Sequence, residues 1–269
     1  MIGKKILFVS SEVIPYLPNN DISSLSYNLP KMVNENGGQT RIFIPKYGVI
    51  NERRHQLHEV IRLSGMNLII DDIDMPLIIK VASIPKERMQ VYFIDNEEYF
   101  KNRGLHSDED KNLYADNDER AIFFAKGVVE TIKKLNWSPD IIHVHGWIAA
   151  LLPLYMKEYY KDEPLFKSSK VVVSIYGKDV SGKLNSKIVK KIKFDEINSE
   201  SLAVLQKSTY TNLFKNAILN SDGIIFADDD IDESILDFAN KSKKPILNCG
   251  FVDGFKKEYL NFYSTHILG

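Results

Sequence analysis

The sequence predicts an α/β fold: a Rossmann-like, mostly parallel sheet with helices on both faces. Short runs rich in β-branched and aromatic residues alternate with longer segments of helical periodicity, which is the pattern of such sheets. Several runs are apolar throughout, as in strands that are buried on both faces. The chain has 269 residues, 44% of them hydrophobic. A single domain of this length buries about 70% of the surface of the unfolded chain.

The expected elements follow one another at regular intervals. A first strand at residues 6–10 precedes a helix at residues 22–36, which ends at Gly37 and Gly38 because glycine adopts the left-handed conformation that ends helices. Further strands are expected at residues 41–44, 77–82, 90–94, 141–145, 171–175 and 223–226. Further helices are expected at residues 117–135, 147–160, 201–220 and 231–240.

One domain is expected to include residues 1–269, with two departures from the regular alternation. Residues 51–83 have the pattern of a β-hairpin, with an acidic cluster at residues 71–74 as its turn. Residues 178–200 contain many lysines and few large apolar residues, so we expect an exposed insertion. Its basic residues are expected to line a solvated helix face rather than a binding patch: Lys187, Lys190, Lys191 and Lys193.

Composition excludes several classes of partner. A net charge of −1 gives no general attraction to nucleic acid or to an acidic membrane surface. No apolar run approaches the roughly 20 residues that span a bilayer, and no early stretch has the features of a signal peptide. The single cysteine, Cys249, excludes an internal disulfide and fits a reducing compartment, so we expect a cytoplasmic protein.

Four motifs occur in a fixed order along the chain. They are Ser11-Glu12-Val13-Ile14-Pro15-Tyr16, Tyr114-Ala115-Asp116-Asn117, His143-Val144-His145-Gly146-Trp147 and Ile246-Leu247-Asn248. Together they resemble the starch/glycogen synthase family, glycosyltransferase family 5. The resemblance implies the N-terminal, Rossmann-like half of a GT-B fold. It also implies an ADP-glucose-dependent α-1,4-glucan glucosyltransferase in which this half holds mainly the acceptor glucan.

The loop before the first helix departs from the family pattern. The family has a lysine–threonine–glycine–glycine–leucine loop there, whose lysine meets the anionic sugar nucleotide and whose glycines let backbone N–H groups approach phosphate. The matching residues here begin at Pro18 and end at Ile22, and Ser24 replaces a nearby aspartate. Pro18 supplies neither a cation nor an N–H group, and Asp21 adds a repelling charge.

Two strand ends depart from the pattern as well. The family's histidine–aspartate–tryptophan–histidine sequence is His145-Gly146-Trp147-Ile148 here, so the second histidine has become Ile148. The histidine–asparagine pair after the next strand is Tyr176-Gly177. With Pro18 and Ser24, these departures predict that no catalytic residue is retained and that the isolated chain is inactive.

A surviving ligand site is expected at the carboxyl ends of the strands, where open α/β sheets form a crevice. Trp147 offers an aromatic face for a sugar ring and an N–H donor, but a buried tryptophan that fills the space under the loop explains the same residue. Asp116 is also an expected helix N-cap. The full set of candidates is Glu12, Tyr16, Asp116, Asn117, His145, Trp147, Tyr176 and Asn248.

No metal or cofactor is expected. His143 and His145 face the same side of a strand, but the sequence places no third ligand beside them. Residues 177–183 lack the spacing of a phosphate-binding loop. The three aspartates at residues 228–230 are expected to cap the helix that follows.

Two functions remain open. One is a transferase subunit that is active only with a separate protein supplying the C-terminal domain. The other is a non-catalytic module that binds a glucan, another small ligand or a protein. An aromatic stretch at residues 251–263 is expected to fold back as a helix on its own domain or to form a homodimer contact.

Overall fold

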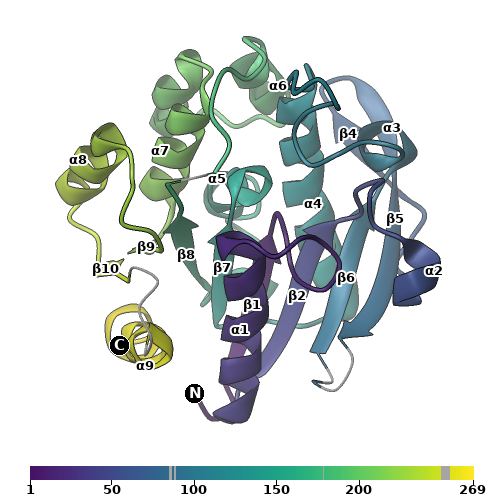
Figure 1. Cartoon of the computed structure of the whole chain (residues 1–269). Coiled ribbons are helices and arrows are strands. Elements are labelled where there is room, and N and C mark those ends of the chain that lie inside the picture. Colours follow the sequence, from purple (N-terminus) through teal and green to yellow (C-terminus); the bar gives the residue numbers. More distant parts are fainter. Residues whose placement is uncertain (85–86, 88, 178, 250–254) are drawn as a thin grey trace.

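A mixed sheet of ten strands forms the centre of the molecule, in the order β10-β9-β8-β7-β1-β2-β6-β5-β3, with β4 paired to β5 (Figure 1). The computed structural model describes residues 1–84, 87, 89–177, 179–249 and 255–269, without the side chains of residues 255 and 256. The strands are β1 Lys5–Ser10, β2 Gln39–Pro45, β3 His58–Glu59, β4 Met66–Ile70, β5 Ile73–Ile84, β6 Met89–Asp95, β7 Ile141–His145, β8 Lys170–Ile175, β9 Gly223–Phe226 and β10 Ile246–Asn248.

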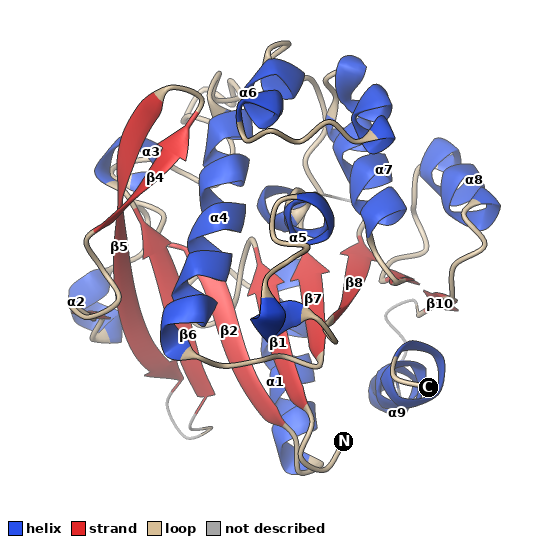
Figure 2. Ribbon diagram, turned by 180° about the vertical axis from the view of Figure 1, so that it is seen from behind, coloured by secondary structure: helices blue, strands red, loops and turns tan. Residues whose placement is uncertain are grey.

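Helices cover both faces of this sheet. The α-helices are α1 Asp21–Glu35, α2 Glu52–His55, α3 Glu97–Phe100, α4 Asn117–Leu135, α5 Leu152–Glu158, α6 Ile188–Phe194, α7 Tyr210–Asn220, α8 Glu233–Lys241 and α9 Phe255–Asn261. Shorter helical turns are η1 Trp147–Ala149, η2 Pro164–Phe166, η3 Glu200–Gln206 and η4 Phe262–Ile267. Helices α1 and α9 lie on one face, and α4, α5 and α7 lie on the other (Figure 2). The predicted Rossmann-like α/β fold is confirmed.

Strand β1 is the centre of the parallel part of the sheet. It pairs in parallel with β2 on one side and with β7 on the other. Its residues Ile6, Phe8 and Val9 have no exposed surface. Because the chain leaves β1 toward β2 and later returns to its other edge at β7, the strand order reverses there. In open α/β sheets, such a reversal leaves a crevice at the carboxyl ends of the strands.

An antiparallel hairpin, β4–β5, lies at the edge of the sheet opposite β10. Ile70 lies opposite Ile73, and Asp71 between them has a left-handed φ of 57°. The expected hairpin at residues 51–83 therefore begins later in the structure, at residue 66, because α2 and β3 occupy the earlier part.

Two helices that were expected to be continuous are interrupted. The segment 147–160 forms the turn η1 and then α5, in whose first turn Pro153 lies, where its missing N–H leaves no bond unmade. The segment 201–220 forms η3 and then α7, because the Thr209 hydroxyl accepts a bond from Asn212 N and starts a new helix. The expected cap of α8 is also displaced: Asp232, rather than residues 228–230, accepts the bond from Ser234 N.

The prediction that residues 178–200 form an exposed insertion is wrong for much of this segment. Helix α6 buries Ile188 and Ile192, which lie on one side of a helix at a spacing of four residues. Lys191 is also buried, and its Nζ lies 2.7 Å from Asp118 Oδ2 and 2.6 Å from Glu119 Oε1. The predicted solvated lysine face therefore does not include Lys191, which attaches α6 to the start of α4.

The C-terminal segment folds back on the domain, as one of the two alternatives predicted. Tyr259, Phe262 and Tyr263 are buried, whereas Phe251 and the side chain of Phe255 lie outside the described residues. The Tyr263 hydroxyl lies 2.6 Å from His143 Nδ1 on β7, and His143 Nε2 lies 2.8 Å from Ser174 Oγ on β8. Burial lowers the pKa of His143 well below its usual value, so the imidazole is neutral at pH 7.

Replacing Tyr263 by Phe should destabilise the fold by about 1–3 kcal/mol, because His143 Nδ1 would be left buried without its partner. Urea-induced unfolding measures the change. Tyr159→Phe is the matched control, since Tyr159 is 43% exposed. Equal effects of the two substitutions would show that the Tyr263–His143 contact does not hold the segment in place.

Candidate functional site

A cavity of about 450 Å³ lies at the carboxyl ends of the strands, where the strand order reverses. It is lined by residues that follow β1, β6, β7, β8 and β9, together with the first turn of α1: Glu12, Pro18, Asn20, Asp21, Ile22, Leu105, His106, Trp147, Tyr176, Asp179, Val180 and Asp228. Among these described residues four are carboxylates, and none is a lysine or an arginine. The candidates Glu12, Trp147 and Tyr176 thus meet in one cavity, with Pro18 at its wall.

The loop before α1 is closed by a capping box. The Asn20 side chain accepts a bond from Ser23 N at 2.8 Å, and the Ser23 hydroxyl accepts one from Asn20 N at 2.9 Å. The Asn20 amide also donates to Glu12 Oε2 at 2.6 Å. Burial raises the pKa of Glu12, and this bond opposes the rise. The N–H groups of Asn20 and Ser23 at this helix terminus are therefore already bonded, and Asp21 adds negative charge in its first turn.

Trp147 and Tyr176 form the inner wall of the cavity. Trp147 is 1% exposed and packs edge-on against Tyr210, with 5.7 Å between ring centroids. Its Nε1 is buried and has no hydrogen-bond partner among the described residues. Tyr176 is buried, and its hydroxyl lies 2.7 Å from His145 Nδ1. His145 therefore lies behind the wall, and burial lowers its pKa to about 3, so it is a neutral group.

Asp116 and Asn117 lie at the start of α4 and do not line the cavity themselves. Asp116 occupies the N-cap position, but its side chain makes no capping bond; both carboxylate oxygens instead accept bonds from Arg103, at 2.6 and 2.7 Å. Asn117 is buried and donates to the Tyr210 hydroxyl at 2.7 Å. It also accepts a bond from the buried Arg120 at 2.8 Å. The side chains of Asp116 and Asn117 are therefore hydrogen-bonded to other protein groups.

Two further sequence candidates, Tyr16 and Asn248, lie away from the cavity, as does Ser24, one of the positions that depart from the family pattern. Tyr16 is buried beside His55 and Phe93. Asn248 is exposed at the end of β10, and none of its atoms lines the cavity. Ser24 lies one turn into α1, where its hydroxyl donates to Asn19 Oδ1 at 2.5 Å.

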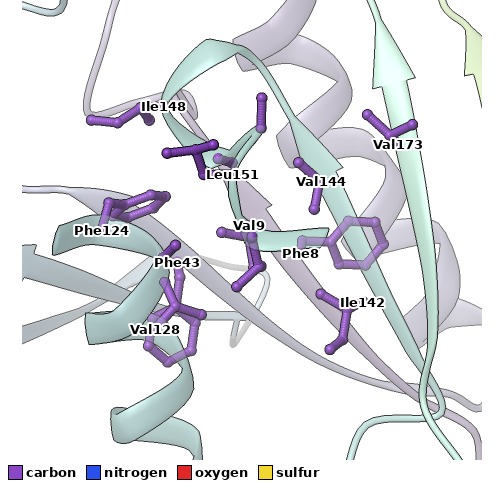
Figure 3. Close-up of a cluster of buried hydrophobic side chains, with 14 of the residues drawn as sticks. Phe8, Val9, Phe43, Phe124, Val128, Ile142, Val144, Ile148, Leu151 and Val173 are labelled. Carbon is purple, nitrogen blue, oxygen red and sulfur yellow. The ribbon is translucent and has the colours of Figure 1, made fainter. Parts of the chain in front are cut away.

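Ile148 belongs to the hydrophobic core. It has no exposed surface, and Figure 3 shows its side chain beside Phe124 and Leu151. The backbone of η1 thus places this side chain in the core below the cavity. The loss of a polar residue at this position, which the sequence suggested, therefore goes together with a new packing contact.

Sequence reasoning missed three polar residues of the cavity: Asp179, His106 and Asp228. Asp179 retains some exposed surface, its Oδ2 atom is buried, and backbone N–H groups of Val180 and Trp147 act on its carboxylate. Burial raises the pKa of Asp179 to about 7, and the nearby charge of Glu12 adds to the rise. His106 is held between strand-end loops, and burial lowers the pKa of its imidazole. None of the three belongs to a motif that spacing alone identifies.

The described residues contain neither a metal-binding cluster nor a membrane-spanning helix. No group of three or more histidine, cysteine, aspartate or glutamate side chains is arranged to hold a metal ion. No described helix is long and apolar enough to cross a membrane. A second cavity, of about 550 Å³, lies between β4, α4 and the ends of α5 and α6. It contains a buried ion pair between Lys126 and Asp195, and none of the sequence candidates.

The motifs and the fold agree with comparisons to known proteins. The family model of the starch synthase catalytic domain matches residues 5–244. The chain belongs to the starch/glycogen synthase family. Glycogen synthases from Chlorobium luteolum and Chlorobaculum tepidum are both 36% identical to it, over 223 and 236 residues.

These comparisons also delimit what the chain includes. The matches cover 81% and 87% of this chain, but 44% and 47% of those two glycogen synthases, so it spans less than half their length. The solved catalytic domain of Starch Synthase IV from Arabidopsis thaliana, bound to ADP and acarbose, has the same fold, with a TM-score of 0.71 and 17% identity. That match covers 91% of this chain and 52% of the Arabidopsis chain.

Restoring the family histidine at position 148 should destabilise the fold by about 2–4 kcal/mol, because an imidazole would be buried among apolar side chains without a partner. Ile148→Leu is the control and should cost less than about 1.5 kcal/mol. Urea-induced unfolding of both variants tests this. A stable Ile148→His protein would mean that the side chain reaches the cavity.

Proposed function

We propose that this starch/glycogen synthase family member binds a neutral glucan in the cavity at the strand ends and does not transfer glucose by itself. The observation that supports this most directly is the charge of the cavity. Glu12, Asp21, Asp179 and Asp228 line it, without lysine or arginine among its described residues. Carboxylates accept hydrogen bonds from sugar hydroxyls but repel a diphosphate.

The start of α1 gives a second, independent reason to expect weak binding of a sugar nucleotide. A phosphate group binds at a helix N-terminus through free N–H groups. Here Ser23 N is already bonded to Asn20, and Pro18 has no N–H group to offer. A diphosphate at this terminus would meet the charge of Asp21 without a lysine or arginine among the described residues of the cavity.

An aromatic wall with a free donor favours a sugar as the ligand. Trp147 contributes a large ring to the lining, and its buried Nε1–H has no hydrogen-bond partner among the described residues. The Arabidopsis relative was solved with acarbose, a sugar-like ligand, in addition to ADP. We extend the sugar ligand, but not the nucleotide, to this chain. A cytoplasmic location is part of the same proposal, and it is consistent with the unpaired thiol of Cys249.

A transferase half that is completed by a separate chain is the second candidate. It is favoured by the extent of the match, which includes 44% of the length of the Chlorobium luteolum glycogen synthase. In such a pair, the second chain would supply the cations for the donor. Both candidate functions predict that the isolated chain is inactive. They differ in whether adding a C-terminal glycogen synthase half produces transferase activity.

The isolated protein should release no ADP from ADP-glucose and glycogen above a heat-inactivated control. ADP release at rates typical of enzymes, about 1 s⁻¹ or more, would contradict the proposal. In a second arm, the C-terminal half of the Chlorobaculum tepidum glycogen synthase is added. Activity that requires both chains would favour the completed transferase over the non-catalytic module.

Maltooligosaccharides at millimolar concentration should change the tryptophan fluorescence, and this response should disappear in Trp147→Phe. Trp137→Phe is the matched control, since Trp137 lies outside the cavity and should leave the response intact. Calorimetry with ADP-glucose should give a Kd weaker than about 1 mM. A micromolar Kd for ADP-glucose, or a sugar response that survives in Trp147→Phe, would count against the assignment.

A further inference from the structure

The second cavity, of about 550 Å³, is a groove along the outer edge of β4. Four consecutive residues of this strand, Met66 to Ile69, form one of its walls. Residues of α4 and of the ends of α5 and α6 form the other wall. Figure 2 shows β4 between β5, to which it is paired, and α4. The cavity, here called the β4 groove, therefore lies on the side of β4 that faces away from β5.

The outer edge of β4 has backbone groups that the sheet does not use. Pro76 of β5 lies opposite Asn67, and its carbonyl accepts a bond from the Asn96 side chain at 2.9 Å. Asn96 follows β6, which pairs with the other edge of β5, so the Pro76 carbonyl points away from β4. Asn67 and Pro76 are thus not a hydrogen-bonded pair. Because such pairs alternate along antiparallel strands, the N–H and C=O groups of Asn67 and Ile69 point into the groove.

A hydrogen bond from α4 agrees with this direction. Lys126 Nζ donates to Ile69 O at 2.8 Å from the groove side of β4. The Asn67 N–H, the Asn67 C=O and the Ile69 N–H have no such bond among the described residues. Asn67 is exposed and Ile69 is 48% exposed, so an incoming chain can reach these groups. An extended segment fits this edge, whereas a helix uses its own backbone groups internally.

Two aromatic side chains make the rim of the β4 groove apolar. Tyr159 and Phe194 are 43% and 50% exposed, and both line the groove together with Ile69. Exposed apolar side chains that gather at a groove are typical of interaction sites. The two rings also offer their faces to a cation.

The charges of the β4 groove favour a basic partner. Three carboxylates line it against one ammonium group: Glu130, Asp195, Glu196 and Lys126. Lys126 is paired with Asp195, and Glu130 is paired with Lys133 at 3.2 Å. The carboxylate of Glu196 is exposed and makes no hydrogen bond or ion pair with the described residues. A basic side chain is therefore attracted to the groove, and an acidic one is repelled.

We propose that the β4 groove binds an extended, basic segment of a partner protein, which pairs as an additional strand with the outer edge of β4. The backbone of the segment bonds to Asn67 and to the Ile69 N–H. One of its basic side chains meets Glu196, and an apolar side chain packs against Tyr159 and Phe194. This site is separate from the cavity at the strand ends and does not depend on the function proposed for it.

Two peptides of seven residues test the proposal. One alternates lysine and valine, and the other has glutamate in place of each lysine. Fluorescence anisotropy with the full chain should give the basic peptide a Kd below about 1 mM, at least about tenfold tighter than the acidic peptide. The NMR amide signals of Asn67 and Ile69 should shift when the basic peptide is added. No binding of the basic peptide at about 1 mM, equal binding of both peptides, or unshifted signals would overturn the proposal.

Asn67→Pro tests the pairing of strands. It removes the N–H that points into the groove, and β5 loses no bond, so binding of the basic peptide should weaken by about tenfold or more. Asn67→Ala is the matched control, because it keeps the N–H and should bind as the unsubstituted chain does. Equal binding by the two variants would overturn the proposal.

Circular dichroism shows whether Asn67→Pro folds. If it does not, the unsubstituted chain is titrated with the basic peptide N-methylated at every internal residue, which lacks backbone donors. Binding that is as tight as that of the unmodified peptide would then overturn the proposal.

Glu196→Gln tests the contribution of charge. It should weaken binding of the basic peptide by about threefold or more at low ionic strength. Glu35→Gln is the control, at an exposed carboxylate in the last turn of α1 and outside the groove, and it should leave binding unchanged. Equal effects of the two substitutions would overturn the choice of a basic partner.

Discussion

The buried guanidinium of Arg120 holds together the loops that form the cavity. It has no exposed surface and donates to Asn117 Oδ1 and to Gly104 O, both at 2.8 Å. Its charged carbon lies 5.9 Å from the Trp147 ring and 5.8 Å from the Tyr47 ring. One side chain of α4 thus contacts the loops after β2, β6 and β7. Aromatic faces and hydrogen bonds compensate part of the cost of burying this charge.

This arrangement separates the scaffold of the family from its chemistry. Asn117 and Arg120, on α4, and Trp147, after β7, are joined by hydrogen bonds and ring contacts beside the cavity. The departures lie in two places: Asn20 caps α1 and holds Glu12 in the loop before that helix, and Ile148 packs in the core.

The sequence predicted the fold because strands such as residues 223–226 are apolar runs with clear ends, and the structure places β9 at these same residues. It did not predict the breaks in two helices, since a single capping hydroxyl at Thr209 outweighs the helical periodicity on either side. The prediction that Lys191 is solvated was wrong for a related reason. The two carboxylates that pair with it, Asp118 and Glu119, are distant in the sequence, and only the tertiary fold brings them to the lysine.

The sequence predicted only those residues of the cavity that belong to recognisable motifs. Glu12, Trp147 and Tyr176 follow strands, so their meeting at one edge of the sheet follows from the parallel order of β1, β7 and β8. Asp179 was missed because its position depends on the space beside Gly146, a relation through space between two loops. The burial of Ile148 was likewise set by the direction of the backbone in η1.

The close approach of Ser11 to Gly146 has a consequence for how this sequence can change over time. An aspartate at position 146 collides with the Ser11 hydroxyl, which would lie 2.1 Å from its Cβ. A side chain at position 146 therefore requires the Ser11 side chain to shift, and the positive φ of 78° adds strain for any residue other than glycine. Substitutions at positions 11 and 146 are thus expected to act non-additively on stability, because each changes the space that the other side chain occupies.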